Sequence, residues 1–327
     1  MENRTPKHIS LVVYEEAVLT AISGPLDVLM GANTYYEQRN ESPPFSIELI
    51  SEKLRQIRLY QPARFICHKT IKEATFSDLV IVPSFQGDPD QVLKKNQAVV
   101  EWIREMKRQG AEVASLCRGS YFLAEAGLLE GFSCTSHWMS VEDMKRRYPG
   151  IKVLPDAVVT DQDGTYTSGG AFSSIHLILY LIEKFCGRET GVHISKVFSI
   201  DIDRVSQAHF AVFQRQRDHE DEQILKAQLY IEKHYDDALT VEELASRSNM
   251  SRRNFIRRFK KATHNTPLEY LQRVKVEAVK KDLERGGESI SSLMLKVGYN
   301  DPKTFRSVFR RVTGLTPQAY RNKYSRA

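Results

Sequence analysis

The last third of the chain contains the same pattern of apolar and polar positions twice. Two phenylalanines four residues apart lie on one face of a helix. The Thr-Pro that follows marks a stop and a restart, since Thr can cap a helix and Pro is tolerated at its first position. The members are Phe255, Phe259, Thr263, Thr266, Pro267 and Tyr270 in the first copy and Phe305, Phe309, Thr313, Thr316, Pro317 and Tyr320 in the second, each fifty positions after its counterpart. Each copy therefore predicts a helix with a buried stripe, a short turn and the start of another helix.

A short capped helix and a tight turn are predicted immediately before each stripe. The residues that indicate them are Thr240 with Glu243, Ser248–Met250 and Ser251 in the first copy, and Ser289, Gly298 and Asp301-Pro302 in the second. Thr-x-x-Glu has the spacing of a capping box, and Asp-Pro is a cap followed by the first residue of a helix. Helix, turn and helix in this order are the layout of a helix-turn-helix unit.

The first 190 residues instead alternate short apolar runs with longer amphipathic stretches. Strands are expected over residues 8–14, 45–51, 78–84 and 111–116, and helices from Gly24-Pro25, over residues 89–110 and, after a turn at Gly169-Gly170, to about Cys186. A continuous apolar strand such as 78–84 is typical of a buried parallel sheet. Strands that alternate with helices predict βαβ units, so the expected fold of this part is α/β with a doubly wound sheet.

The boundary between the two parts is indicated by composition. The stretch Gln214–Glu222 contains almost no apolar side chain and alternates in charge, which is typical of a linker. The amphipathic stretch Ile224–His234 then predicts the first helix of the second domain. We therefore expect a first domain over residues 1–190, a connecting segment and linker over 191–222, and an all-α domain with two helix-turn-helix units over 223–327.

Charge is divided unevenly between these parts. Residues 221–327 hold 22 Lys and Arg against 13 Asp and Glu, a net charge of +9, whereas the first 220 residues hold 25 against 28, a net charge of −3. The two sum to the +6 of the whole chain. A nearly neutral larger part joined to a basic smaller part suggests one domain for sensing or catalysis and one for nucleic acid.

Several classes of protein are disfavoured by the sequence. No apolar run approaches the roughly 20 residues that span a bilayer, and the start MENRTPKHIS has no apolar signal region, so we expect a cytoplasmic protein without a membrane partner. The four cysteines show no Cys-x-x-Cys spacing, which disfavours a zinc site or a disulfide framework. We expect neither a metal nor a cofactor.

The strand over 111–116 runs directly into Cys117-Arg118-Gly119-Ser120 and then into a helix. A nucleophile on such a strand-to-helix turn is exposed above the sheet, and the helix N-terminus behind it lowers a thiol pKa. Twenty residues further on, His137 is expected at the end of a strand. Cysteine with histidine is the pair that activates a thiolate, so the sequence raises the question of catalysis.

The second helix of each helix-turn-helix unit is basic. The cations are Arg252, Arg253, Arg257, Arg258, Lys260 and Lys261 in the first and Lys303, Arg306, Arg310 and Arg311 in the second. A cationic helix behind a tight turn suits the major groove, where phosphates supply affinity and base edges supply sequence. The alternative is a solvated charged face, and the repetition of the same capped, basic unit favours DNA.

At these residues the sequence resembles the DNA-binding domain of the AraC/XylS family of transcription regulators. The resemblance covers roughly residues 222–325 and includes GYNDPKTFRSVFRRVTGLTPQAY. It implies that one long helix, Leu268 to about Arg285, joins the two units and that the recognition helices enter successive major grooves about 34 Å apart. The base-reading residues it implies are Arg252, Arg253, Ile256 and Arg257 in the first recognition helix and Lys303, Arg306 and Ser307 in the second.

The first domain resembles the PfpI-like, class I glutamine-amidotransferase-like domains, which are flavodoxin-like. The matching stretches are GPLD at Gly24, ASLCRGSYFLAEAGLLEGFSCTSHW and TSGGAFSSIHLILYLIEKFCG, within about residues 8–190. Followed by an AraC-type domain, it looks like the GlxA-type transcription regulators. That resemblance implies a first domain that senses a small metabolite, nitrogenous or carboxylate, and mediates dimerisation. It also implies promoter DNA and RNA polymerase as partners, with an activator as the expected role.

Two interpretations of the elbow remain. In one, Cys117 is a nucleophile, His137 its base, and backbone amides near Arg118 an oxyanion hole. In the other, Cys117 is an inherited residue of a ligand pocket. The resemblance places an acid at the position of Ala21, where this chain has none, although Glu15, Glu16 or Asp27 could substitute. A regulator must also retain its ligand, since turnover would erase the signal.

We therefore expect no enzyme and an effector pocket at the carboxyl ends of the strands. Its expected lining is Cys117, Arg118, His137, Gly169 and Gly170, with Arg118 pairing a ligand carboxylate. For His137 the alternative is a hydrogen-bonded core residue. Two other functions remain open: a cysteine-dependent hydrolase or amidotransferase with a DNA-binding appendage, and an architectural DNA-binding protein whose first domain only dimerises.

Overall fold

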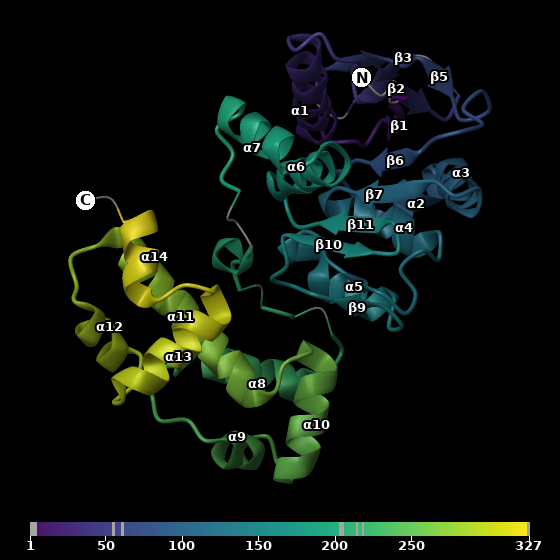
Figure 1. The fold of residues 1–327 in the computed structure, drawn as a ribbon. Helices are drawn as coiled ribbons and strands as arrows, with labels where there is room; N and C mark the ends of the chain where they lie inside the picture. The colour runs from purple at the N-terminus through teal and green to yellow at the C-terminus, as the bar shows by residue number, and fades with distance from the viewer. Residues whose placement is uncertain are drawn as a thin grey trace. The chain divides into compact units, whose positions relative to one another are not determined.

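The chain forms two compact units, residues 1–207 and 208–327. The computed structural model, drawn in Figure 1, describes residues 5–53, 56–59, 62–202, 206–213, 215–217 and 219–325. Among these residues, none of the helices combines the length and the apolar character that crossing a bilayer would require. Two positions of the predicted linker, Gln214 and Asp218, lie outside the described residues.

The first unit is built on a seven-stranded sheet in the order β10-β11-β7-β6-β1-β2-β5. Its strands are β1 (Lys7–Val12), β2 (Phe45–Ser51), β5 (Lys69–Thr70), β6 (Leu79–Val82), β7 (Glu112–Ser115), β10 (Val159–Gln162) and β11 (Thr165–Ser168). All neighbours pair in parallel except β10 and β11, which form an antiparallel hairpin. Two small ribbons lie outside it, β3 (Gln56–Arg58) with β4 (Arg64–Ile66) and β8 (Ser133–Cys134) with β9 (Lys152–Val153).

Helices cover both faces of this sheet, as the doubly wound prediction requires. They are α1 (Thr20–Glu37), α2 (Pro89–Lys95), α3 (Gln97–Arg108), α4 (Ser120–Glu125), α5 (Val141–Arg147), α6 (Ser173–Cys186) and α7 (Arg188–Val197). Helices α1, α6 and α7 pack together on one side, and α2, α3 and α4 pack together on the other (Figure 1). The central strands are buried on both faces, every residue of β6 being inaccessible to solvent. The unit is therefore a flavodoxin-like α/β fold.

Three boundaries in this unit differ from the predictions. Helix α1 begins at Thr20 and takes Pro25 into its interior, so Gly24-Pro25 does not open it. The helix expected over 89–110 is broken at the buried Asn96, whose side-chain amide donates to the Val92 carbonyl at 2.9 Å and so competes with the helical pattern. Helix α7 runs across the predicted domain end at residue 190, and the first compact unit ends only at Gln207.

The second unit is all-α, and its repeats follow the predicted plan. Its helices are α8 (Glu222–Lys233), α9 (Val241–Arg247), α10 (Arg252–Thr263), α11 (Pro267–Arg285), α12 (Ile290–Lys296), α13 (Pro302–Thr313) and α14 (Pro317–Tyr324), preceded by the single turn η3 (Ala208–Phe210). The long helix α11 joins the pair α9 and α10 to the pair α12 and α13.

Side-chain caps begin all seven of these helices. The sequence predicts six of them, at Thr240, Ser251, Thr266, Ser289, Asp301 and Thr316, and the seventh is Asp221 at the start of α8. The predicted box at Thr240 is only half formed: its hydroxyl accepts from the Glu243 N–H at 3.1 Å. The reciprocal box forms instead at Thr266, whose N–H donates to Glu269 at 2.8 Å.

The two helix-turn-helix units have separate apolar cores. Phe255, Phe259 and Tyr270 belong to the first core, and Phe305, Phe309 and Tyr320 belong to the second. All six are at most 2% exposed, which confirms the buried stripes. Helix α11 serves both cores, because Leu271 and Val274 near its start face the first and Val276, Val279 and Leu283 face the second.

Gly298 lies where the two halves of this unit approach each other. Its φ of +74° is a conformation that favours glycine. A Cβ added there would lie 2.4 Å from the carbonyl oxygen of Asp236, which follows α8, and 3.1 Å from Nζ of Lys275 on α11. The turn of the second helix-turn-helix unit therefore rests directly on the backbone at the end of α8.

Candidate effector pocket and nucleic-acid interface

The predicted strand-to-helix elbow is present. Cys117 follows β7 with a φ of +56°, a strained value for a residue with a side chain, and a single turn of 3-10 helix leads into α4. Two residues on, a Cβ on Gly119 would lie 2.4 Å from the Val82 carbonyl oxygen and 2.9 Å from that of Pro83. Only glycine permits this approach to the end of β6, which places the thiol above the carboxyl ends of two central strands.

Burial decides the protonation of the Cys117 thiol. Because the residue is only 5% exposed, desolvation raises the pKa of the thiol, although hydrogen bonding from Ser84, Ala171 and Arg118 acts in the opposite direction. The expectation that the helix N-terminus lowers this pKa is therefore wrong, since α4 is short and the site is enclosed. The thiol is held in its neutral, weakly nucleophilic form.

His137 lies three residues beyond β8 and begins a short 3-10 turn. Its Nδ1 accepts a hydrogen bond from the Met139 N–H at 3.1 Å, so the neutral ring carries its proton on Nε2. Burial, and then the charge of Arg118, lower the pKa of the imidazole. Within the described residues the ring and the Cys117 thiol form no hydrogen bond with each other, so the activated pair of a cysteine hydrolase is not assembled.

The Arg118 guanidinium lies beside the thiol and is incompletely paired. Its Nη1 and Nη2 donate to the carbonyls of Phe85 at 3.4 Å and Gly87 at 3.1 Å, and its Cζ lies 4.4 Å from the centre of the Phe85 ring. Its Nε is buried and has no hydrogen-bond partner in the described part of the chain. No carboxylate of those residues forms an ion pair with it, which leaves a positive charge for an anion.

These side chains line a cavity of about 510 Å³. Cys117, Arg118 and His137 are brought together in its lining, as predicted, but Gly169 and Gly170 lie behind it. Added Cβ atoms there would meet Gln207 at 2.6 Å and the His137 ring at 2.4 Å, respectively. Ala171 and Ser174 take their place in the lining, since α6 begins at Ser173 and the turn extends beyond Gly170.

The acid that a cysteine hydrolase would need is absent from the wall beside the thiol. Ala21 lines the cavity, whereas Glu15, Glu16 and Asp27 do not. Glu16 is held elsewhere by Lys95 at 2.7 Å.

The residues on the far wall of the cavity were not predicted from the sequence. There Asp143 accepts from the Tyr121 hydroxyl at 2.7 Å and from Arg147 Nε at 2.7 Å, and Arg147 also pairs with Asp90. The only sequence signal is the four-residue spacing of Asp143 and Arg147 on a helix, which is common on surfaces. Arg146 of the lining also pairs with Asp143, and the lining carboxylate of Asp88 accepts from the Gln91 N–H at the start of α2. Arg118 forms no ion pair with any of these described carboxylates.

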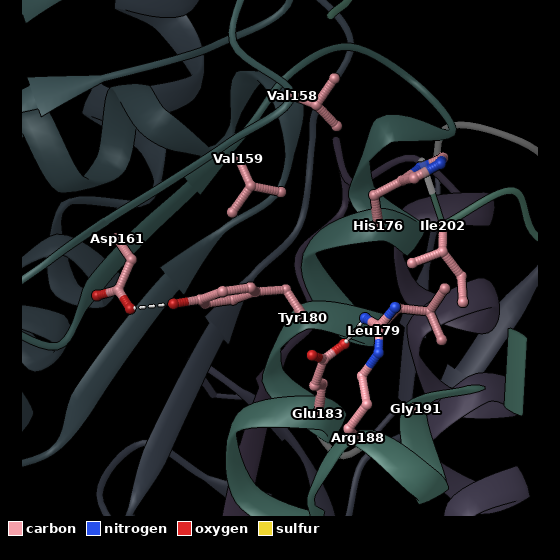
Figure 2. Close-up of a pocket in the computed structure, with 10 residues that line it drawn as sticks. All are labelled: Val158, Val159, Asp161, His176, Leu179, Tyr180, Glu183, Arg188, Gly191 and Ile202. Carbon is pink, nitrogen blue, oxygen red and sulfur yellow. Dashed lines mark hydrogen bonds and ion pairs between the residues drawn. The ribbon is translucent and has the colours of Figure 1, made fainter. Parts of the chain in front are cut away.

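A second cavity, of about 480 Å³, opens between β10 and the helices α6 and α7 (Figure 2). It contains none of the predicted site residues. Its charges are satisfied internally, Asp161 by the Tyr180 hydroxyl and Lys184, and Glu183 by Arg188 at 2.7 Å. This second cavity is therefore less suited to bind an anion than the cavity at Arg118. Among the described residues, no group of three or more His, Cys, Asp or Glu is placed to hold a metal ion.

The two recognition helices expose most of the predicted base-reading residues. Arg252, Arg253 and Arg257 on α10 and Lys303, Arg306 and Ser307 on α13 are exposed, and Ile256 is half-buried. Two of them have local partners: Arg252 pairs with Glu242 at 2.6 Å, and Arg257 donates to Asn254 at 2.9 Å.

Two cations of the expected basic faces have partners on other parts of the second unit. Arg258 forms a two-bond pair with Asp221 at 2.7 and 2.9 Å, and Arg311 donates to Gln272 of α11. Arg258 is half-buried, whereas Arg311 remains exposed, so of these two only Arg258 leaves the exposed basic set.

The protonated thiol leads to a measurable expectation. The rate at which iodoacetamide alkylates Cys117 in the full chain should continue to rise with pH above about 8.5, the ordinary pKa of a free cysteine, because burial raises the pKa of this thiol. Mass spectrometry of the Cys117 peptide at a series of pH values measures it. A rate that levels off below pH 8 would show an activated thiolate and return the enzyme interpretation.

Comparison with known proteins supports the same division. The profile of the DJ-1/PfpI family matches residues 8–184, and that of a helix-turn-helix domain matches residues 244–323. The HTH-type transcriptional regulator GbdR of Pseudomonas aeruginosa is 24% identical over 318 residues, which cover 97% of this chain and 84% of GbdR. Isonitrile hydratase of Pseudomonas putida is 26% identical over 184 residues, or 56% of this chain and 73% of the hydratase.

A crystal structure of an AraC family transcriptional regulator from Pseudomonas putida superposes with a TM-score of 0.52. At 17% identity it covers 59% of this chain and all of its own, and it shows the fold alone. The chain therefore belongs to the DJ-1/PfpI family and carries an AraC-type helix-turn-helix domain after it, which together make it a transcription regulator with a DNA-binding domain.

Proposed function

We propose that this protein is a sequence-specific transcription regulator whose first unit binds a small carboxylate-bearing effector at Arg118. The observation that carries the proposal is the half-buried Arg118 side chain, whose buried Nε has no hydrogen-bond partner among the described residues, in a cavity of about 510 Å³. A buried donor without a partner is costly unless a ligand completes it. The planar guanidinium can also form two parallel hydrogen bonds to a carboxylate, which a point charge such as an ammonium group cannot.

The neighbouring groups favour the same ligand. The neutral His137 carries its proton on Nε2 and can donate it, because Nδ1 is occupied by Met139. The Phe85 ring lies next to the guanidinium, with Cζ 4.4 Å from the ring centre, and restricts the movement of that group. An effector of a few heavy atoms with a carboxylate, with or without nitrogen elsewhere, fits these donors and the volume of the cavity.

DNA binding is assigned to the two recognition helices. We propose that Arg252, Arg253, Ile256 and Arg257 read one major groove and that Lys303, Arg306 and Ser307 read the next. A second copy of the chain, paired through the first unit, would add two further helices and lengthen the operator. We further propose that the protein is an activator that contacts RNA polymerase and that it works in the cytoplasm, where it meets DNA.

The runner-up function is a cysteine-dependent enzyme, which the similarity to isonitrile hydratase favours. Three features weigh against it: the neutral thiol, the unassembled Cys117–His137 pair, and Ala21 where an acid would stand. A panel of nitrile, isonitrile and amide substrates tests it. Turnover that disappears in Cys117→Ala would establish the enzyme and remove the proposed sensing role.

The effector site is tested by Arg118→Ala in the full chain. Small carboxylic acids are screened by thermal shift against the native protein, and the acid giving the largest shift is titrated by calorimetry. Charge-assisted hydrogen bonds are worth roughly 1.5–3 kcal/mol, so we expect an affinity loss of about tenfold to 150-fold. Arg188→Ala, in the second cavity, is the matched control and should leave the affinity unchanged. Equal affinity in Arg118→Ala would end the proposal.

A further inference from the structure

The side chain of Gln207, the last residue of the first unit, is anchored inside that unit. It is 1% exposed. Its Oε1 accepts from the Gly170 N–H at 2.8 Å, and its Nε2 donates to the Ser136 carbonyl at 2.9 Å and the Pro155 carbonyl at 3.0 Å. An amide so fully enclosed is held in a single arrangement, and its loss would leave several buried polar groups unpaired.

These partners form the back of the effector cavity. Gly170 lies against the His137 ring, where an added Cβ would be 2.4 Å from Cδ2. Ser136, next to His137 in the chain, donates through its hydroxyl to the Cys117 carbonyl at 3.2 Å. Any shift of His137 or of the elbow therefore acts on the residues that hold the Gln207 amide.

The next residue, Ala208, belongs to the second unit. The described residues 208–213, 215–217 and 219–221 then form a strap along the DNA-binding helices. Its turn η3 packs against the recognition helix α13. The Ala211 carbonyl accepts from Lys280 Nζ at 2.7 Å, and the ring of Phe213 meets that of Tyr270 edge-on at 5.1 Å. Lys280, on α11, is only 3% exposed.

The later part of the strap is fixed equally well. Arg215 pairs at 3.2 Å with Glu232 of α8, whose side chain is 6% exposed. The Gln216 carbonyl accepts from the buried Gln228 at 2.8 Å. Asp221 finally pairs with Arg258 on the recognition helix α10. The strap thus contacts both recognition helices and the helix that joins them, in the region where the sequence predicts a linker.

We propose that Gln207 is the coupling residue through which the state of the Cys117 cavity reaches both recognition helices. This inference rests on the proposed function and adds the route of regulation. An occupant of the cavity that favours one placement of His137 and Gly170 favours one placement of the Gln207 amide. The strap, starting at the next residue, carries that preference to α13, α11 and α10. Coupling of this kind is reciprocal, so DNA must in turn affect the cavity.

Reciprocity permits a test without a known effector. The probe is a duplex fragment selected from genomic DNA by the full-length protein, and the readout is the rate at which iodoacetamide alkylates Cys117 with and without that fragment. We expect the fragment to change the rate severalfold, because DNA binding shifts the population of cavity conformations from which Cys117 reacts. Cys134, which is fully buried outside the cavity, is the internal reference in the same mass spectra.

Two variants separate coupling from stability. Inserting Gly-Ser-Gly-Ser after Gln207 keeps every native side chain but adds a flexible segment between Gln207 and Ala208. Gln207→Leu removes the side-chain amide and keeps a similar side-chain volume. In both, the fragment should bind as in the native protein, but its effect on the Cys117 rate should fall below twofold. The matched control is the same insertion after Glu41, in an exposed loop, which should preserve the full effect.

The outcomes distinguish the inference from the function on which it rests. An undiminished fragment effect in the insertion variant, or no effect in the native protein while the fragment binds, overturns the coupling and leaves the regulator intact. Failure to select any fragment overturns the proposed DNA recognition and the coupling with it. Loss of the effect in the insertion variant, with thermal unfolding and fragment affinity unchanged, supports the inference even if Gln207→Leu folds poorly.

Discussion

Replacing both Arg257 and Arg306 by alanine should abolish the preference of the protein for a selected promoter fragment over bulk DNA. Both side chains are exposed on recognition helices, and neither forms an ion pair with a described residue. A bidentate contact to a base is worth roughly 1–3 kcal/mol. Since the two helices have separate cores, the effects should add to about 2–6 kcal/mol. Competition gel shifts against specific and random duplexes measure the loss.

The single variants show which kind of contact each arginine makes. Loss of discrimination at particular bases in Arg306→Ala identifies base reading, whereas equal weakening on all sequences, with a shallower dependence on salt, identifies phosphate contacts. Arg108→Ala, an exposed arginine on α3 of the first unit, is the control and should change neither quantity. If the double variant retained its preference, recognition would have to lie elsewhere in the second unit.

Phe309→Ala should destabilise the second helix-turn-helix unit by about 3–5 kcal/mol, the usual cost of removing a buried phenylalanine. Phe309 is 0% exposed, and its ring lies 5.7 Å from that of Tyr320. Because the core of Phe259 is separate, the footprint should shrink to the part read by α10, whereas Phe259→Ala should leave the part read by α13.

Chemical denaturation and footprinting of each variant measure the two effects. Leu268→Ala is the matched control, because this leucine is 53% exposed and its truncation should cost far less. Loss of the entire footprint in both phenylalanine variants would mean that the two halves fold as one cooperative body, against the division into two cores.

The repeated units could be predicted because their signals are local. Ser251 and Asp301 cap the helices that follow them, and Phe305 and Phe309 mark a buried face by spacing alone. The elbow at Cys117 could also be predicted from the local sequence, because a cysteine directly between an apolar strand and a helix is typical of a strand-to-helix turn. In such cases the neighbours in sequence are also the neighbours in space.

The sequence-based predictions were wrong or incomplete where residues distant in sequence determine the environment of a side chain. Arg258 reads as one more cation of a basic face, but Asp221, thirty-seven positions earlier, turns it inward. The thiol pKa of Cys117 depends on enclosure by several elements, which no local pattern records. The sequence of the strap is typical of a linker, because its partners lie on distant elements. Arg215 pairs with Glu232 of α8, and the Ala211 carbonyl accepts from Lys280 of α11. Nothing near Gln207 in the sequence identifies its partners around Gly170.

The tight seat of Gly298 on the Asp236 carbonyl has a consequence for the promoters that this protein can use. Helix α11, with 19 residues, sets a length of about 28 Å between the two halves, and the glycine contact removes the freedom to swing about it. One extra base pair would displace half of the site by about 3.4 Å along the duplex. Natural targets should therefore vary in their bases but keep a constant interval between the two segments that are read.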